Sequence, residues 1–178
     1  MDSIYASQEQ QLDVIASLEA LRSDDPVIRE KARNVLITAG SAAVVPLAQS
    51  LKDPADHVCW EAAKALGAIG DPAAASALVE TLEHPNHDVR WVAAEALPAL
   101  GRDGLKQVLM ALLTKSGSSW VQKSAHHALA KLADHKSGYF LKPLLEKFDA
   151  FEPGVAIPPA ALRALYELEK QESLNRKG

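Results

Sequence analysis

The sequence predicts an all-α fold, a right-handed α-solenoid of about four helical hairpins with a further helix at each end. Three observations predict it. Alanine occurs 31 times and leucine 24 times in 178 residues, whereas aromatic residues make up only 5%, and Ala and Leu lose little free energy on entering a helix. A segment of about 31 residues repeats along the chain. Within each copy, apolar residues recur at helical spacing between glycines and prolines.

The internal repeat is the strongest of these signals. Residues 51–81 and 82–112 share 11 identities in 31 positions, whereas chance pairing in a chain this rich in Ala and Leu gives about 2 or 3. The matched positions include Trp60 and Trp91. Weaker copies flank this pair on both sides, as expected for end repeats that must face water.

A single repeat domain is predicted, with a helix at either end. Apolar spacing indicates an N-terminal capping helix over residues 7–22, followed by repeats over residues 24–148 and a C-terminal helix over residues 157–172. Residues 139–148 are expected to form the second helix of the last unit. Three prolines within residues 152–159 are expected to prevent a continuous helix there, because proline lacks the backbone donor.

Each repeat is predicted to contain two helices. In the second unit the first helix covers about residues 56–69, and Gly70 ends it as a C-cap glycine. Asp71 and Pro72 then restart the chain as an N-cap acid and a first-turn proline. The second helix covers about residues 73–83. One such hairpin cannot bury its apolar stripe alone, so neighbouring hairpins are expected to stack.

The second and third units together carry a recognisable residue pattern. It consists of Gly70, Asp71, Pro72, Leu78, Leu82, Pro85, Val89, Arg90, Trp91, Ala93, Ala94, Glu95, Ala96, Leu97 and Gly101. With this pattern, residues 24–148 resemble HEAT repeats, and most closely the short bacterial kind named after the phycobilisome (PBS) lyases. The resemblance implies an armadillo-like superhelix, a bacterial source and a scaffold that binds another protein.

Charge and hydropathy narrow the classes of partner. Lys and Arg total 19 against 23 Asp and Glu, giving a net charge of −4. Nucleic acid and anionic membranes both attract clustered basic residues, so neither is an expected partner. No apolar run approaches the roughly 20 residues of a membrane span, and the N-terminus lacks the pattern of a signal peptide. We therefore expect a cytoplasmic protein, with a monomer favoured over an oligomer.

The spacing of the histidines and the cysteine does not favour catalysis. His84 and His87 lie in a predicted turn, where a solvated role is simpler than metal binding because no supporting shell is evident. His126 and His127 are adjacent on a helix and so point about 100° apart. Cys59 has no basic neighbour in sequence that would activate its thiol. We expect no catalytic residue, no metal ion and no cofactor, and therefore a protein that is not an enzyme.

Trp60 and Trp91 are candidates for protein binding because they occupy the same position in successive repeats. Counting 100° per residue places Trp60 away from the seam between the two helices of its hairpin. Each indole either fills the groove against the first helix of the next unit or stays partly exposed. In the second case the two side chains are rigid aromatic anchors for a partner.

The second helices of such stacks usually line the concave side, and their outward residues are further candidates for protein binding. They are Gln49 in one unit, Glu80 in the next, and Val108, Ala111 and Leu112 in the third. Because the third helix is apolar where the others are mixed, it is either buried against the irregular fourth unit or exposed to a partner. The exposed alternative predicts that Leu112→Asp weakens binding and leaves the helical circular dichroism intact.

The predicted function is that of a non-enzymatic scaffold or adaptor, which binds another protein through the concave and ridge surfaces of the repeat stack. The name of the resembled family suggests an alternative. In that alternative the chain is a bilin lyase-like subunit, or a chaperone, that acts on the chromophore of a phycobiliprotein. No spacing of residues favours this alternative.

Overall fold

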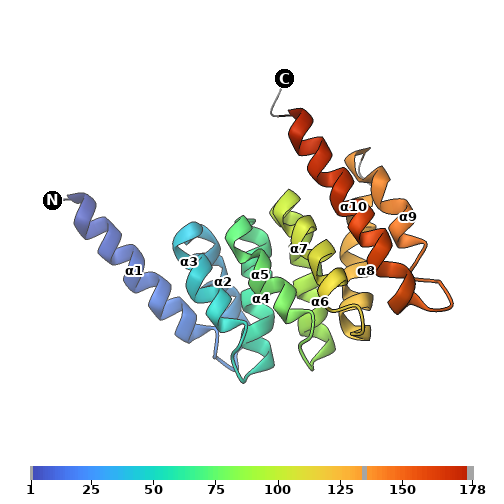
Figure 1. The fold of residues 1–178 in the computed structure, drawn as a ribbon. Coiled ribbons are helices and arrows are strands. Elements are labelled where there is room, and N and C mark those ends of the chain that lie inside the picture. The colour runs from blue at the N-terminus through green and yellow to red at the C-terminus, as the bar shows by residue number, and fades with distance from the viewer. Residues whose placement is uncertain (1, 134–135, 176–178) are drawn as a thin grey trace.

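Hairpins of two helices follow one another along the chain and stack side by side (Figure 1). The computed structural model describes the backbone of residues 2–133 and 136–175, and the side chains of residues 8–133 and 139–174. Within these residues all regular structure is helical. The elements, with η for 3-10 helices, are α1 (Asp2–Ala20), α2 (Pro26–Ala39), α3 (Ser41–Ser50), α4 (Asp56–Ile69), η1 (Pro72–Ala74), α5 (Ala75–Thr81), α6 (His87–Ala96), η2 (Leu97–Leu100), α7 (Gly101–Thr114), α8 (Ser119–Ala133), η3 (Lys136–Leu141), α9 (Lys142–Leu145) and α10 (Pro153–Asn175).

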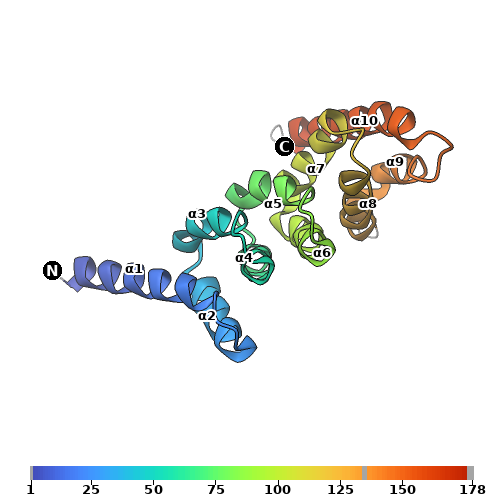
Figure 2. The same cartoon turned by 90° about the horizontal axis from the view of Figure 1, so that it is seen from below.

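The helices form two layers, and Figure 2 shows α4 and α6 below α3, α5 and α7. We call α2, α4, α6 and α8 the first layer, and α1, α3, α5, α7 and α10 the second layer. In the first layer α4 packs against both α2 and α6, and α6 packs against α8. In the second layer α7 packs against α5 and α10. Each hairpin thus gives one helix to each layer, and the predicted α-solenoid is confirmed.

Turn chemistry sets the helix boundaries within each repeat. Gly70 has φ 70° and ψ 16° and ends α4 in the left-handed region, which glycine adopts without steric cost. Asp71 then caps η1, because its carboxylate accepts a hydrogen bond of 2.9 Å from the Ala73 amide. Asn86 caps α6 in the same way and accepts a hydrogen bond of 2.8 Å from the Asp88 amide. The predicted glycine C-cap and aspartate N-cap are both confirmed.

Small residues allow the first-layer helices to approach one another closely, while leucines fill the space between the layers. Gly67 shows this best, because a Cβ atom added there would lie 2.8 Å from the Cβ of Ala96 on α6. Fully buried leucines form a continuous core along the stack. They include Leu21, Leu36, Leu47, Leu66, Leu78, Leu82, Leu97, Leu109, Leu112 and Leu129.

The C-terminal part differs from the sequence prediction. Residues 139–148 do not form one helix; they include the end of η3 and the short helix α9. The second-layer place beside α7 is taken by α10. This helix starts at Pro153 and contains Pro158 and Pro159, so the expected break within residues 152–159 is wrong. Pro153 is the first helical residue, where a proline loses no hydrogen bond. Burial of Ile157 and Ala161 stabilises the turns that contain Pro158 and Pro159, although both lack a backbone donor.

The apolar face of α7 is covered. Val108 and Leu112 are fully buried and Ala111 is 3% exposed. The reason is that α7 is packed against α5, α8 and α10. The hypothesis of an exposed apolar patch at these three residues is therefore wrong, and burial, the other alternative, is correct. No described helix is both long and apolar enough to cross a membrane.

Candidate binding surface on the first helical layer

One position near the start of each first-layer helix fixes the turn that precedes it. Arg29 donates from Nη1 to the carbonyl oxygens of the two residues six and five positions earlier, at 2.8 and 3.0 Å. Arg90 repeats these bonds at 2.7 and 2.8 Å. Cys59 and Gln122 occupy the same place in their helices and donate to the carbonyl six positions earlier. The side chain that follows this position in α4 and α6 is a tryptophan.

Trp60 and Trp91 are both accessible on this layer. Trp60 is half-buried, and Lys64 Nζ lies 4.5 Å from its ring centroid in a cation–π contact. Trp91 is 48% exposed, and the ring of His127 on α8 stacks on it with centroids 3.8 Å apart. Each indole therefore packs on a neighbour and still presents surface to solvent. For Trp91, partial exposure is the alternative that the structure supports.

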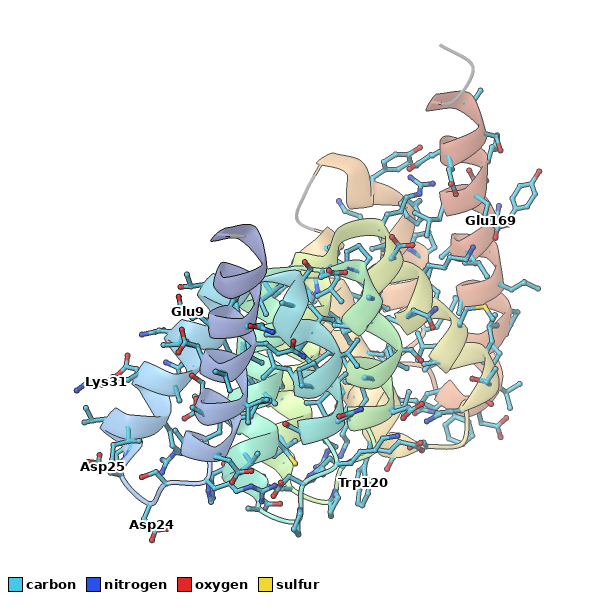
Figure 3. The ribbon with its side chains drawn as sticks, turned by 90° about the vertical axis from the view of Figure 1, so that its left-hand side faces the viewer. Glu9, Asp24, Asp25, Lys31, Trp120 and Glu169 are labelled. Atoms are coloured by element: carbon cyan, nitrogen blue, oxygen red, sulfur yellow. The ribbon has the colours of Figure 1, made fainter. Side chains whose placement is uncertain are left out.

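Trp120 belongs to the same surface, although the repeat pattern does not point to it. It is 44% exposed, and Arg90 Cζ lies 4.7 Å from its ring centroid. In Figure 3 it lies at the same edge of the molecule as Asp24 and Asp25, which precede α2. The repeat alignment pairs Trp91 with Lys123, so Trp120 is not at the repeated position. Trp120 lies three residues before Lys123, which is about one helical turn. This spacing places Trp120 on the same face of the helix as the repeated position, and it could have been found in the sequence.

Two adjoining cavities connect the three indoles. A cavity of about 330 Å³ between α4 and α6 is lined by Trp60, Lys64 and Trp91, among others. A second cavity of about 250 Å³ between α6 and α8 is lined by Trp91 and Trp120. Because Trp91 lines both, the surface is continuous across three helices. We call Trp60, Trp91, Trp120 and these two cavities the tryptophan surface.

Charged side chains link the helices beneath and beside this surface. Glu95 on α6 contacts His127 and Lys131 on α8. The hydrogen bond from Lys131, together with that from His127, lowers the pKa of Glu95, against the opposing effect of partial burial. Between α2 and α4, the buried Glu61 pairs with Arg33 and with Arg29. These pairs fix the positions of neighbouring helices, and hence of the indoles that the helices carry.

The second-layer candidates lie apart from the tryptophan surface. Gln49 on α3 and Glu80 on α5 are exposed, and Glu80 pairs with Lys52 at 3.2 Å. Glu80 lines a cavity of about 330 Å³ together with Asp53 and Glu83. Neither residue lines the cavities beside the tryptophans. Their role in protein binding stays a prediction.

His84, His126 and Cys59 have structural partners, whereas the buried Nε2 of His57 has no hydrogen-bond partner among the described residues. His84 Nδ1 accepts a hydrogen bond of 3.1 Å from the Asn86 amide. The His126 ring packs on Phe148, whereas that of His127 packs on Trp91. Burial, and then the charge of Asp53, raise the pKa of the Cys59 thiol. Among the residues that the structure describes, no group of three His, Cys, Asp or Glu side chains could hold a metal ion.

Comparison with known proteins gives the family. The model of HEAT repeats matches residues 16–98 and 76–152, which is most of the chain. No curated protein matches. Among solved structures, an engineered protein is 25% identical with a TM-score of 0.47, over 86% of this chain and 80% of that chain. A designed armadillo repeat protein in complex with the peptide (KR)4 is 21% identical with a TM-score of 0.41, over 90% of each chain. On the strength of the family match and the stacked hairpins, the chain belongs to the HEAT-repeat family.

Proposed function

We propose that this HEAT-repeat protein is a non-enzymatic scaffold that binds another protein through its tryptophan surface. One observation carries the proposal. All three tryptophans of the chain lie on successive first-layer helices and line two adjoining cavities. Tryptophan and arginine are enriched among the residues that dominate binding energy at protein interfaces.

The architecture supports binding by a preformed surface. Ion pairs and close packing hold α4, α6 and α8 against one another. Tryptophan has only two rotatable side-chain angles, so its side chain loses little conformational entropy when a partner covers it. A rigid repeat stack therefore reduces the ordering cost of association, which otherwise offsets part of the energy of burial.

A quantitative pull-down from the native lysate tests the proposal. Trp91→Ala is expected to weaken capture of the bound protein about tenfold or more, as truncation of a central aromatic anchor does. Tyr166→Ala is the matched control, because Tyr166 is 63% exposed but lies on α10 in the second layer. Equal capture by both variants, with unchanged circular dichroism, would contradict the proposal.

The alternative of chromophore handling is tested on the same preparation. Phycocyanobilin added to the protein is expected to leave the absorbance spectrum of the chromophore unchanged. A saturable spectral shift that Trp91→Ala abolishes would instead assign the tryptophan surface to the chromophore.

A further inference from the structure

The cavity between α6 and α8 differs in charge from other cavities of the molecule. Its lining consists of His87, Arg90, Trp91, Ala94, Trp120, Lys123, Ser124 and His127. It thus contains two permanent cations and, among these described residues, no carboxylate. By contrast, the cavity between α3 and α5 is lined by Asp53, Glu80 and Glu83 beside one lysine, Lys52, and that between α1 and α2 by Asp13. The cavity between α9 and α10 has two cations, Lys147 and Arg163, but also the carboxylate of Glu167. In a chain of net charge −4, this cavity is a local site of positive charge.

Arg90 is held in a fixed orientation at this cavity. Its Nη1 donates to the carbonyl oxygens of His84 and Pro85 at 2.7 and 2.8 Å, and its guanidinium packs on the Trp120 ring. Within the described part of the chain, Nε and Nη2 make no hydrogen bond. These two donors form the edge of the guanidinium that binds a carboxylate or phosphoryl group in bidentate geometry.

Lys123 supplies a second positive charge at this cavity. It is exposed on α8, and the described residues provide no ion pair for it. The other lysine of α8 differs, because Lys131 contacts Glu95. Lys123 is therefore the lysine of α8 that remains available to an external anion.

The size of the cavity limits what can enter it. Its volume of about 250 Å³ is below the roughly 300–1,000 Å³ of most small-molecule sites. It suits one or two side chains of a bound segment better than a whole cofactor. Trp91 and Trp120 provide aromatic walls on which the apolar part of such a side chain can pack.

We infer that this cavity anchors an acidic segment of the partner protein. A carboxylate or phosphoryl group of that segment binds Arg90 and Lys123, and an adjacent aromatic or aliphatic side chain packs against Trp91 or Trp120. The inference rests on the proposed function, because it names the chemical class of the protein that the tryptophan surface binds. Charge complementarity between an anionic segment and the two cations carries it.

Fluorescence titration tests the inference with defined probes. Tryptophan emission is recorded while a short peptide of alternating Glu and Tyr is added, and then its counterpart with Gln in place of Glu. The Glu peptide is expected to give a saturable change that weakens with added salt, and the Gln peptide to bind about tenfold more weakly or not at all. A peptide with phosphotyrosine in place of Tyr shows whether the site prefers a phosphoryl group or a carboxylate. Tighter binding of this peptide or of the Glu peptide, relative to the Gln peptide, supports the site.

Matched variants locate the binding. Lys123→Glu is expected to weaken the Glu peptide about tenfold or more, whereas Lys31→Glu, an exposed lysine on α2 at the other end of the stack, is expected to have no effect (Figure 3). Circular dichroism confirms folding of both. Equal affinity for the Glu and Gln peptides, or no effect of Lys123→Glu, would overturn the inference. So would tighter binding of a duplex oligonucleotide than of the peptide.

Failure of this inference differs from failure of the proposed function. If Trp91→Ala abolishes capture of a protein from the lysate while no acidic peptide binds, the scaffold proposal stands and the partner is not acidic. If neither experiment gives binding at the tryptophan surface, both are wrong.

Discussion

Glu95 is the residue that most directly couples α6 to α8. Its carboxylate contacts the side chains of His127 and Lys131 in the next repeat. The hydrogen bond from Lys131 is the main cause of its lowered pKa. A carboxyl group whose pKa is lower in the folded state stabilises the fold at pH values above its unfolded pKa. That contribution is lost as the pH falls through the lowered, folded-state pKa.

The first prediction concerns Glu95→Gln. At neutral pH the variant is expected to have a free energy of unfolding lower by about 1 kcal/mol, because Lys131 loses its ionised partner and His127 loses a hydrogen-bond partner. The difference from the wild-type protein should narrow as the pH falls below the ordinary glutamate pKa of about 4.5. Urea denaturation across this pH range measures it. Glu9→Gln, at an exposed residue of α1, is the control, and an equal effect there would contradict the assignment.

The second prediction concerns Leu112, which is fully buried on α7. Leu112→Asp is expected to abolish folding, because it removes a buried leucine, worth about 2–5 kcal/mol, and places a carboxylate in its cavity. Thermal unfolding followed by circular dichroism measures the loss. Leu162→Asp, at a leucine 58% exposed on α10, should retain the helical signal. A folded Leu112→Asp protein would show that this face is open.

These residues also show how far the sequence predicts the site. The repeat identifies Trp60 and Trp91 because it places them at one position. It does not identify Trp120, which lies one turn before that position and whose contact with Arg90 depends on how α6 and α8 pack. The sequence does not decide between exposure and burial of Leu112, because the repeat pattern does not show that α10 packs against α7.

At the scale of the helix pair, Gly67 sets the distance between α4 and α6. Glycine inside a helix ordinarily costs about 1 kcal/mol relative to alanine, so Gly67→Ala would stabilise an isolated helix. In this structure the new Cβ would meet the Ala96 Cβ at 2.8 Å and its Cα at 2.9 Å. Contacts this short require the two helices to move apart.

The third prediction follows from that contact. Gly67→Ala is expected to destabilise the protein by about 1–3 kcal/mol, the usual cost of overpacking, in spite of the gain in helix propensity. Gly117→Ala is the matched control, because a Cβ there meets nothing within 4 Å, and it should be neutral or stabilising. Urea midpoints of both variants give the sign. A more stable Gly67→Ala protein would contradict the close packing of α4 on α6.

The sequence predicts the elements whose boundaries depend on local signals, but not those that depend on distant contacts. The glycine and aspartate that separate α4 from η1 determine backbone geometry by their own chemistry. The last unit has no such local signal. Its helix α10 packs against α7 but follows an irregular segment and begins with a turn that contains proline. Proline content alone therefore predicted a break where packing of Ile157 and Ala161 maintains a helix.

At the scale of the whole molecule, contacts between consecutive repeats keep the surface in one shape. They recur along the stack, as in Arg22 with Asp53 at 2.5 Å and Asn86 with Asp56 at 2.7 Å. Each repeat thus depends on its neighbours, as in other stacked-repeat proteins. A surface that spans α4, α6 and α8 is preorganised by the stack as a whole.

Acrylamide quenching of tryptophan fluorescence in variants that keep one tryptophan each tests the central claim most directly. The claim is that stacked first-layer helices hold indoles open to solvent. Proteins that retain only Trp91 or only Trp120 are expected to be quenched readily, because these side chains are 48% and 44% exposed. Emission from both that resists acrylamide in the folded protein would contradict the account.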